Sequence, residues 1–134
     1  MEMICNETVK ENITIARFLG YKTYKELQNL PKEDKYLSNW FFMHDNKEGS
    51  FAWEPESLRY HRDWNHLMLA VEKLETLGYG FHISPNSMEI IDYTTGNEET
   101  IFQFDFDSDT KKIEQFHYTV VKTIEWYNKN IKND

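Results

Sequence analysis

The segment from Trp64 to Leu74 carries hydrophobic residues at the spacing of one helix face. These residues are Trp64, Leu67, Met68, Val71 and Leu74. They recur every three to four positions, which places them on one side of a helix. Asp63 precedes the pattern and can accept hydrogen bonds from the first free backbone N–H groups. Gly78 follows it, where many helices end, so the pattern predicts a helix between these two residues.

Two further segments have the same period. Residues 8–20 start with Thr8 and Glu11 in the form of a capping box, and Gly20 is a natural helix end. The apolar residues of this segment are Val9, Ile13 and Ala16. Near the other end of the chain, an apolar stripe predicts a long helix over about residues 110–131. Its members are Ile113, Phe116, Val120, Ile124, Tyr127 and Ile131.

Short runs of β-branched and aromatic residues predict strands between the last two helices. The runs are GFHIS (80–84), SMEIIDY (87–93) and TIFQFDF (100–106), and turn-forming residues separate them. In the third run the phenylalanines alternate with other residues, which puts them on one face. Residues 31–57 are less regular, and their NWFFMH and SFAWE runs are compatible with an edge hairpin or an ordered aromatic loop.

The order helix, aromatic segment, helix, strand meander, helix predicts an α+β fold. We expect an antiparallel sheet of three to five strands packed with about three helices. The length of 134 residues fits a single domain over residues 1–134.

The charge balance argues against direct nucleic-acid binding. Asp plus Glu total 23 and Lys plus Arg total 15, which gives a formal net charge of −8. An acidic chain is repelled by phosphates at long range. A basic protein partner, or solubility alone, fits this charge better.

Cysteine content and hydropathy point to the cytosol. Cys5 is the single cysteine, so neither an intrachain disulfide nor a cysteine-based zinc site can form. The N-terminal residues lack the basic and apolar regions of a signal peptide, and no apolar run approaches the ~20 residues that span a bilayer. We expect a cytoplasmic protein without membrane or cofactor.

Three stretches resemble a set of small bacteriophage and prophage proteins. They are IARFLGYK (15–22), YHRDWNHLMLAVEKLE (60–75) and YTVVKTIEWYN (118–128), and the match covers most of the chain outside residues 23–58. The chain is also loosely similar to the phage-type α–β–α sandwich domain. It has Leu69-Ala70 where these proteins are expected to have Pro-Val. The resemblance implies a phage or prophage origin and action in a bacterial host cytosol, and it implies no particular activity.

Histidines near Asp63 raise the question of a metal-dependent enzyme. His61, Asp63 and His66 lie within six residues, but His61 precedes the expected cap and Asp63 is the cap itself. We expect no metal site here, and a metal-dependent enzyme using His61 and His66 remains the second alternative. His117 lies among the apolar positions of the last helix and is expected to be a core or boundary histidine.

The segment from Asp105 to Phe116 begins like a calcium-binding loop and then departs from it. Thr110 stands at the sixth position, where the EF-hand has glycine, and Phe116 stands at the twelfth, where it has glutamate. We interpret Asp107 or Asp109 as the cap of the last helix.

Aromatic residues outside the helix stripes are the strongest candidates for a binding surface. They are Tyr36, Trp40, Trp53, Tyr118 and Trp126. Exposed aromatic side chains are typical of protein interfaces and of sites for planar ligands. The leading hypothesis is a non-enzymatic accessory protein that binds a protein partner, such as a host or defence factor, or forms a homodimer. The alternative is a binder of a small planar ligand such as a nucleotide.

Overall fold

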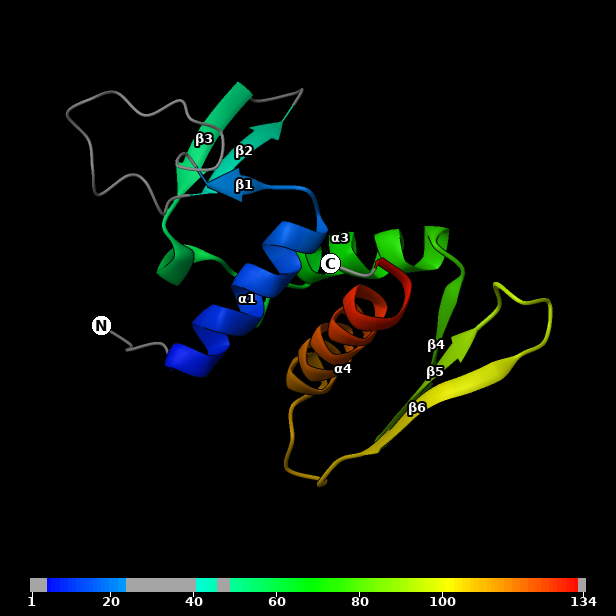
Figure 1. The fold of residues 1–134 in the computed structure, drawn as a ribbon. Helices are drawn as coiled ribbons and strands as arrows, with labels where there is room; N and C mark the ends of the chain where they lie inside the picture. Colours follow the sequence, from blue (N-terminus) through cyan, green and yellow to red (C-terminus); the bar gives the residue numbers. More distant parts are fainter. Residues whose placement is uncertain (1–4, 24–40, 46–48, 133–134) are drawn as a thin grey trace. The chain divides into compact units, whose positions relative to one another are not determined.

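The computed structural model describes residues 5–23, 41–45 and 49–132. Contacts divide the chain into two compact units, residues 1–59 and 60–134, and each unit has its own three-stranded antiparallel sheet (Figure 1). The fold is α+β, as predicted. Its described strands form two sheets rather than one, and the single domain stays a prediction.

Unit 1, residues 1–59, contains helix α1 and the sheet β1-β2-β3. Its elements are α1 (Asn6–Phe18), β1 (Lys22–Thr23), β2 (Phe41–Asp45), β3 (Gly49–Trp53) and the 3-10 helix η2 (Pro55–Ser57). β2 pairs with β3 as a hairpin in which Phe41 lies opposite Trp53. The aromatic segment therefore forms a hairpin in its described part, one of the two arrangements that the sequence left open.

Helix α1 begins earlier than its sequence pattern predicts. Cys5 occupies the N-cap position without a side-chain hydrogen bond, and Thr8 lies inside the first turn. The capping-box prediction for Thr8 and Glu11 is therefore wrong. The predicted end is confirmed, because Gly20 has a φ of 93° and its N–H donates to the carbonyl of Arg17 at 3.0 Å. This left-handed conformation is accessible to glycine without steric cost.

The buried side of α1 agrees with the predicted one only in part, since Ala16 is fully buried as predicted. Ile15 and Asn12 are buried, whereas Val9 and Ile13 are only half-buried. The Asn12 side-chain amide donates to the Leu58 carbonyl at 3.2 Å. A polar residue at this position thus connects α1 to the segment after η2 without leaving that carbonyl unsatisfied.

Unit 2, residues 60–134, contains the sheet β4-β5-β6 with helix α4 along one face (Figure 1). Its elements are α3 (Trp64–Thr76), β4 (Tyr79–Ser84), β5 (Ser87–Asp92), β6 (Glu99–Asp105), α4 (Lys112–Tyr127) and the π-helical turn η3 (Asn128–Lys132). The three predicted strands are confirmed to within a residue or two. Phe116 of α4 stacks on Phe81 of β4 with ring centroids 6.5 Å apart, which shows the contact between helix and sheet directly.

Helix α3 begins where the sequence predicts. The Asp63 carboxylate accepts hydrogen bonds from the N–H groups of Asn65 at 2.9 Å and His66 at 3.3 Å, so its role as N-cap is confirmed. The predicted apolar face needs one correction. Trp64 is 41% exposed, whereas Ala70, which the predicted face did not include, is fully buried. The buried side of the helix consists of Leu67, Ala70, Val71 and Leu74.

Helix α4 is shorter than predicted, and its predicted stripe is confirmed only in part: Val120 and Ile124 are fully buried. Lys111 is at its N-cap position with no side-chain cap, so capping by Asp107 or Asp109 is wrong. Ile131 of the predicted stripe lies in η3 and is 53% exposed. The buried residues of α4 are Gln115, His117, Thr119, Val120, Val121, Thr123 and Ile124. They occupy more than one side of the helix, which the single-stripe prediction missed.

Strand register gives the sheet of unit 2 two distinct faces. Directly paired residues lie on the same face. The helix-covered face carries Phe81, Met88, Ile90, Phe102 and Phe104. The other face, which we call the polar face, carries His82, Glu89, Gln103 and Asp105 and also the buried Ile91, which lies opposite Gly80. Tyr93 contacts this face after the end of β5. The register shifts between Ile90 and Ile91, which leaves Ile101 as the extra residue of a β-bulge.

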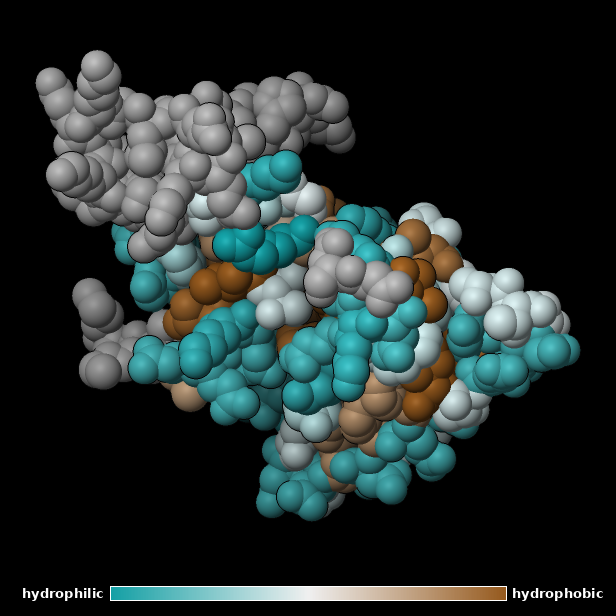
Figure 2. Space-filling view, in the orientation of Figure 1, coloured by the Kyte–Doolittle hydropathy of each residue, from teal (hydrophilic) through white to brown (hydrophobic). Residues whose placement is uncertain are grey.

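Hydrophilic residues cover most of the surface visible in Figure 2, with hydrophobic residues in smaller areas. The large hydrophobic side chains that are exposed are Trp64, Leu69, Ile83, Tyr93, Tyr118 and Ile131. Within the described residues, none of the helices combines the length and apolar content required to cross a membrane.

Candidate functional site: an aromatic pocket between β6 and α4

Phe102 and Phe104 of β6, with Phe106 just after the end of the strand, form a continuous aromatic row beside α4. Phe102 and Phe104 are stacked with centroids 5.3 Å apart, and Phe104 and Phe106 follow at 6.3 Å. The row exists because side chains two positions apart in a strand share one face. Met88 lies opposite Phe104 in the neighbouring strand, so the row borders the buried core.

Tyr118 of α4 completes this aromatic cluster. Its ring meets Phe104 edge-to-face at 5.2 Å and Phe106 at 6.0 Å, an arrangement that aromatic quadrupoles favour. The side chain nevertheless remains 40% exposed. The ammonium group of Lys122 lies 5.6 Å from its ring centroid and 3.7 Å from the Glu125 carboxylate. Tyr118 therefore packs on the phenylalanine row with one part of its ring and is open to solvent and to Lys122 with the rest.

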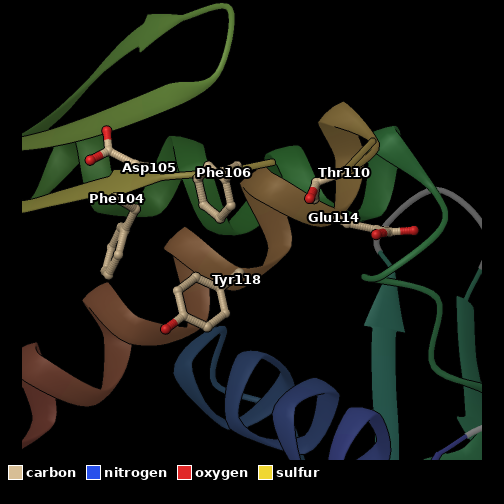
Figure 3. A pocket seen from close by; sticks show the side chains of 6 residues that line it. All are labelled: Phe104, Asp105, Phe106, Thr110, Glu114 and Tyr118. Carbon is tan, nitrogen blue, oxygen red and sulfur yellow. The ribbon is translucent and has the colours of Figure 1, made fainter. Parts of the chain in front are cut away.

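A pocket of about 430 Å³ opens beside this cluster. We call it the β6/α4 pocket. Its lining residues are Phe104, Asp105, Phe106, Thr110, Glu114 and Tyr118. Figure 3 shows the three rings grouped together, with Thr110 and Glu114 toward one end and the Asp105 carboxylate directed away from the rings. The volume falls within the range of about 300–1,000 Å³ that is usual for ligand sites.

The lining determines which chemical groups the pocket suits. Ring faces carry partial negative charge and attract cations, and Glu114 lies one helical turn before Tyr118 on α4. None of the six lining residues is lysine, arginine or histidine. Lys122 contacts the Tyr118 ring from outside the lining and lies 3.7 Å from the Glu125 carboxylate. An aliphatic stem ending in a cation matches the lining, whereas a phosphate group would meet the carboxylates of Asp105 and Glu114 with no cation among the lining residues.

The two predicted interaction residues of unit 2, Tyr118 and Trp126, have different neighbours. Tyr118 lines the β6/α4 pocket. Trp126 packs edge-to-face on Tyr79 at 5.9 Å, so it lies partly in the core toward β4. Trp53 belongs to unit 1, where the Arg59 guanidinium lies 5.2 Å from its ring centroid.

Tyr36 and Trp40 lie outside the described residues. The role of all five aromatic residues as an interaction surface stays a prediction.

The histidines form a different pair from the one considered in the sequence. The ring of His61 lies 6.1 Å from that of His117, while His66 lies near Tyr60 at 6.1 Å and within 4.0 Å of Asp63. His117 is only 6% exposed, which confirms it as a core or boundary histidine. Burial, and then the nearby His61, lower the pKa of His117 to about 4. Burial, and then Arg62, also lower the pKa of His61.

These shifts favour neutral imidazole rings, which can be metal ligands. Over the described residues, however, no group of three or more His, Cys, Asp or Glu side chains is arranged to hold a metal ion. His61 and His66 therefore have no described third ligand, and the metal-dependent enzyme gains no support from their geometry.

A second, smaller pocket of about 240 Å³ lies in unit 1. Its lining residues are Val9, Ile13, Arg17, Thr23, Phe41, Pro55 and Glu56. Arg17 lies 5.7 Å from the Phe41 ring centroid, so this pocket already contains a cation on its aromatic ring.

Sequence reasoning missed the contribution of β6 to the candidate site. The alternation of Phe102, Phe104 and Phe106 was visible, but it equally predicts a row buried in the core. The position of Tyr118 on an α4 face opposite these rings depends on how the helix packs, which sequence spacing alone does not provide.

Comparison with known protein families, with curated proteins and with solved structures found no match for this chain. The chemistry of the β6/α4 pocket is therefore the main guide to function.

Proposed function

We propose that this chain is a non-enzymatic binding protein that engages a protein partner through the β6/α4 pocket. The observation that carries the proposal is a pocket of about 430 Å³ in which two phenylalanine rings and two acidic residues border Tyr118, whose side chain is 40% exposed. Aromatic side chains set in a hollow are typical anchors of protein interfaces. Tyrosine suits this role because its ring is apolar while its hydroxyl remains hydrated.

The charge of the pocket favours a protein partner over a nucleotide. A nucleotide site needs basic groups or backbone N–H groups near its phosphates. Asp105 and Glu114 instead add negative charge to the lining, and the whole chain has a formal net charge of −8. A basic surface of a partner protein would be attracted over a longer range and aligned by the same field.

The biological setting follows from the resemblance to small phage and prophage proteins. A protein of this kind would act in the cytosol of a bacterial host, and its partner would be a host or defence factor. Such a role requires stoichiometric binding rather than turnover, which agrees with a site built from aromatic rings and carboxylates.

The experiment compares two tyrosines of equal exposure. Tyr118 is 40% exposed and lines the pocket, whereas Tyr93 is 41% exposed and contacts the polar face. The wild-type, Tyr118→Ala and Tyr93→Ala proteins are each immobilised on a resin and incubated with bacterial lysate. The lysate proteins that each resin retains are quantified by mass spectrometry. We expect one basic protein to be retained by the wild type and Tyr93→Ala and lost with Tyr118→Ala.

Thermal unfolding of the three proteins serves as the control for folding. Both variants should remain folded at the capture temperature, because each removes a side chain that is about two-fifths exposed. A partner retained equally by Tyr118→Ala, or the absence of any partner for the wild type, contradicts the proposed function.

A further inference from the structure

Strand β6 is an edge of its sheet. Its hydrogen-bond pattern identifies the residues whose backbone N–H and C=O groups point away from the sheet. The N–H of Phe106, which follows the last residue of β6, donates to the carbonyl of Asn86, which precedes the first residue of β5, at 2.7 Å. In an antiparallel ladder the direction of the backbone polar groups alternates with each residue. Phe104 and Phe102 therefore also direct their N–H and C=O groups toward β5, while Gln103 and Asp105 direct theirs toward the outer edge.

The outward groups of Gln103 and Asp105 have no strand partner in the described part of unit 2, where β6 pairs with β5 alone. Such an edge is a template for one more strand. The bulge at Ile101 lies before these residues. Because a bulge bends and twists its strand, the regular part of the edge is confined to the segment after it.

The edge and the β6/α4 pocket are continuous. Asp105 lines the pocket although its carboxylate points away from the aromatic rings (Figure 3), and its backbone groups are among those that face outward. A strand added along this edge would therefore run past the mouth of the pocket. Its side chains would alternate between the α4 side, beside Tyr118, and the polar face, beside Asp105 and Gln103.

Charge indicates the composition of the added strand. The acidic residues between the end of β6 and the first turn of α4 are Asp105, Asp107, Asp109 and Glu114, and all are exposed. The two lysines of this region are Lys111 and Lys112, and the Lys112 ammonium is already bonded to the carbonyls of Ser84 at 3.3 Å and Pro85 at 3.0 Å. The surroundings of the edge thus remain acidic.

We propose that the occupant of this site is an extended, basic segment of the partner protein that adds as a fourth strand to the outer edge of β6. This inference rests on the proposed function and specifies its partner. Backbone pairing with Gln103 and Asp105 holds the segment. One lysine or arginine places its aliphatic stem against Phe104, Phe106 and Tyr118 and its cation near Glu114. This is strand addition in the manner of other peptide-binding sheet edges, with one side-chain pocket that confers specificity.

The first test uses a short, blocked peptide of alternating lysine and valine as the probe. It is titrated into the isotopically labelled protein and followed through backbone amide chemical shifts and hydrogen exchange. We expect shifts at residues 103–106 and at Tyr118. We also expect new protection of the Gln103 and Asp105 amides, whereas the Phe104 and Phe106 amides are protected already in the free protein.

Two matched peptides separate backbone pairing from charge. In one, alternate peptide nitrogens are methylated, so that it cannot pair with a strand edge. In the other, every lysine is acetylated, so that it is neutral. Each should bind at least ~10-fold more weakly than the parent peptide, because a lost set of hydrogen bonds or charge-assisted contacts corresponds to that change or more. Equal binding by the methylated peptide overturns strand addition, and equal binding by the acetylated peptide overturns the requirement for a cation.

A variant of the edge itself provides the second test. Gln103→Pro removes the outward N–H and places a ring on the edge, which a strand tolerates when that N–H faces solvent. We expect this variant to fold, as judged by its amide spectrum, and to lose binding of the lysine–valine peptide. Gln103→Thr retains the N–H and should bind as the wild type does. If Gln103→Pro does not fold, the methylated peptide and the exchange measurement decide the question alone.

The outcomes distinguish this inference from the proposed function. Tyr118-dependent capture of a basic protein, together with failure of the parent peptide to bind at millimolar concentration, overturns strand addition and leaves the proposed function in place. A free protein that sediments as a dimer, and that Gln103→Pro converts to a monomer, shows a second copy of this chain on the edge and also overturns the basic segment as its occupant.

Discussion

The two faces of the β4-β5-β6 sheet show how the same three strands serve packing on one side and polar contacts on the other. On the helix-covered face, Ile90 is fully buried between Phe81 and Phe102 of the neighbouring strands. On the polar face, the exposed His82 and Tyr93 form a hydrogen bond of 2.9 Å. Buried side chains such as Ile90 should therefore contribute far more to the stability of unit 2 than the exposed side chains of the polar face. Ile91, which pairs with Gly80 on the polar face, is an exception because it is only 5% exposed.

Replacement of Ile90 should have the largest effect. Ile90→Ala leaves a cavity among fully packed side chains and should lower the free energy of unfolding by about 3–4 kcal/mol. Glu89→Ala, one residue earlier and on the polar face, should cost less than about 1 kcal/mol. Urea unfolding followed by circular dichroism measures both values. Equal losses would show that the two faces do not differ in packing.

The next effect is the dependence of stability on pH through His117. Burial lowers its pKa in the folded protein to about 4, below the value of the unfolded chain. The unfolded state therefore binds a proton first as the pH falls, and stability decreases between about pH 6.5 and pH 4 and not further below that range. His61 has the same sign, because its pKa is also lowered. The loss from His117 should be about 3 kcal/mol.

Two variants identify the histidine responsible for this pH dependence. His117→Gln should flatten the stability profile between pH 6.5 and pH 4, because the titrating group is removed. His82→Gln, on the polar face, should retain most of the wild-type slope. A profile that His117→Gln leaves unchanged would assign the slope to other groups.

A smaller effect is expected where Tyr93 covers Gly80. A Cβ atom at Gly80 would lie 2.5 Å from the Cε2 atom of Tyr93, so Gly80→Ala must displace this ring and break its contact with His82. The ring is 41% exposed and can move toward solvent, so the loss should be only about 1 kcal/mol. In a Tyr93→Ala background the same substitution should cost almost nothing, and this difference is measured by a double-mutant cycle.

The smallest effect should come from Tyr93→Phe. It removes the hydroxyl that bonds to His82 at 2.9 Å and leaves the ring over Gly80. Because both partners are exposed, water replaces the lost bond, and the change should be about 0.5 kcal/mol or less. A loss above about 1.5 kcal/mol in urea unfolding would mean that this contact is shielded from water.

The sequence predicted the elements of unit 2 because their signals are local. Asp63 precedes an apolar period and caps α3, and turn-forming residues separate β4, β5 and β6. The prediction for Thr8 and Glu11 was wrong because the same spacing occurs inside a helix. In α4 the buried Thr119 and Thr123 were not expected as core residues, since hydroxyl groups count as polar when only the pattern is considered.

The candidate site was predictable only in part. Tyr118 was selected because it lies off the apolar stripe, but its neighbours Phe104 and Phe106 come from another element. The ring contact between His61 and His117 likewise joins two residues that are far apart in the sequence. Both arrangements depend on how α4 packs in unit 2, and one sequence contains no direct signal for such distant pairs.

The hydroxyl groups of the two buried threonines of α4 find their hydrogen-bond acceptors within the helix itself. The Thr119 hydroxyl donates to the Gln115 carbonyl at 2.8 Å, and the Thr123 hydroxyl donates to the Thr119 carbonyl at 2.7 Å. The Thr119 hydroxyl also lies 3.5 Å from the Met88 sulfur, but its single proton is directed to the much closer Gln115 carbonyl, so this contact with the sheet is at most a weak, shared hydrogen bond. A small shift of the helix over the sheet would therefore leave these two hydroxyl bonds intact, and it would act mainly on the bonds from the Lys112 ammonium to the carbonyls of Ser84 and Pro85.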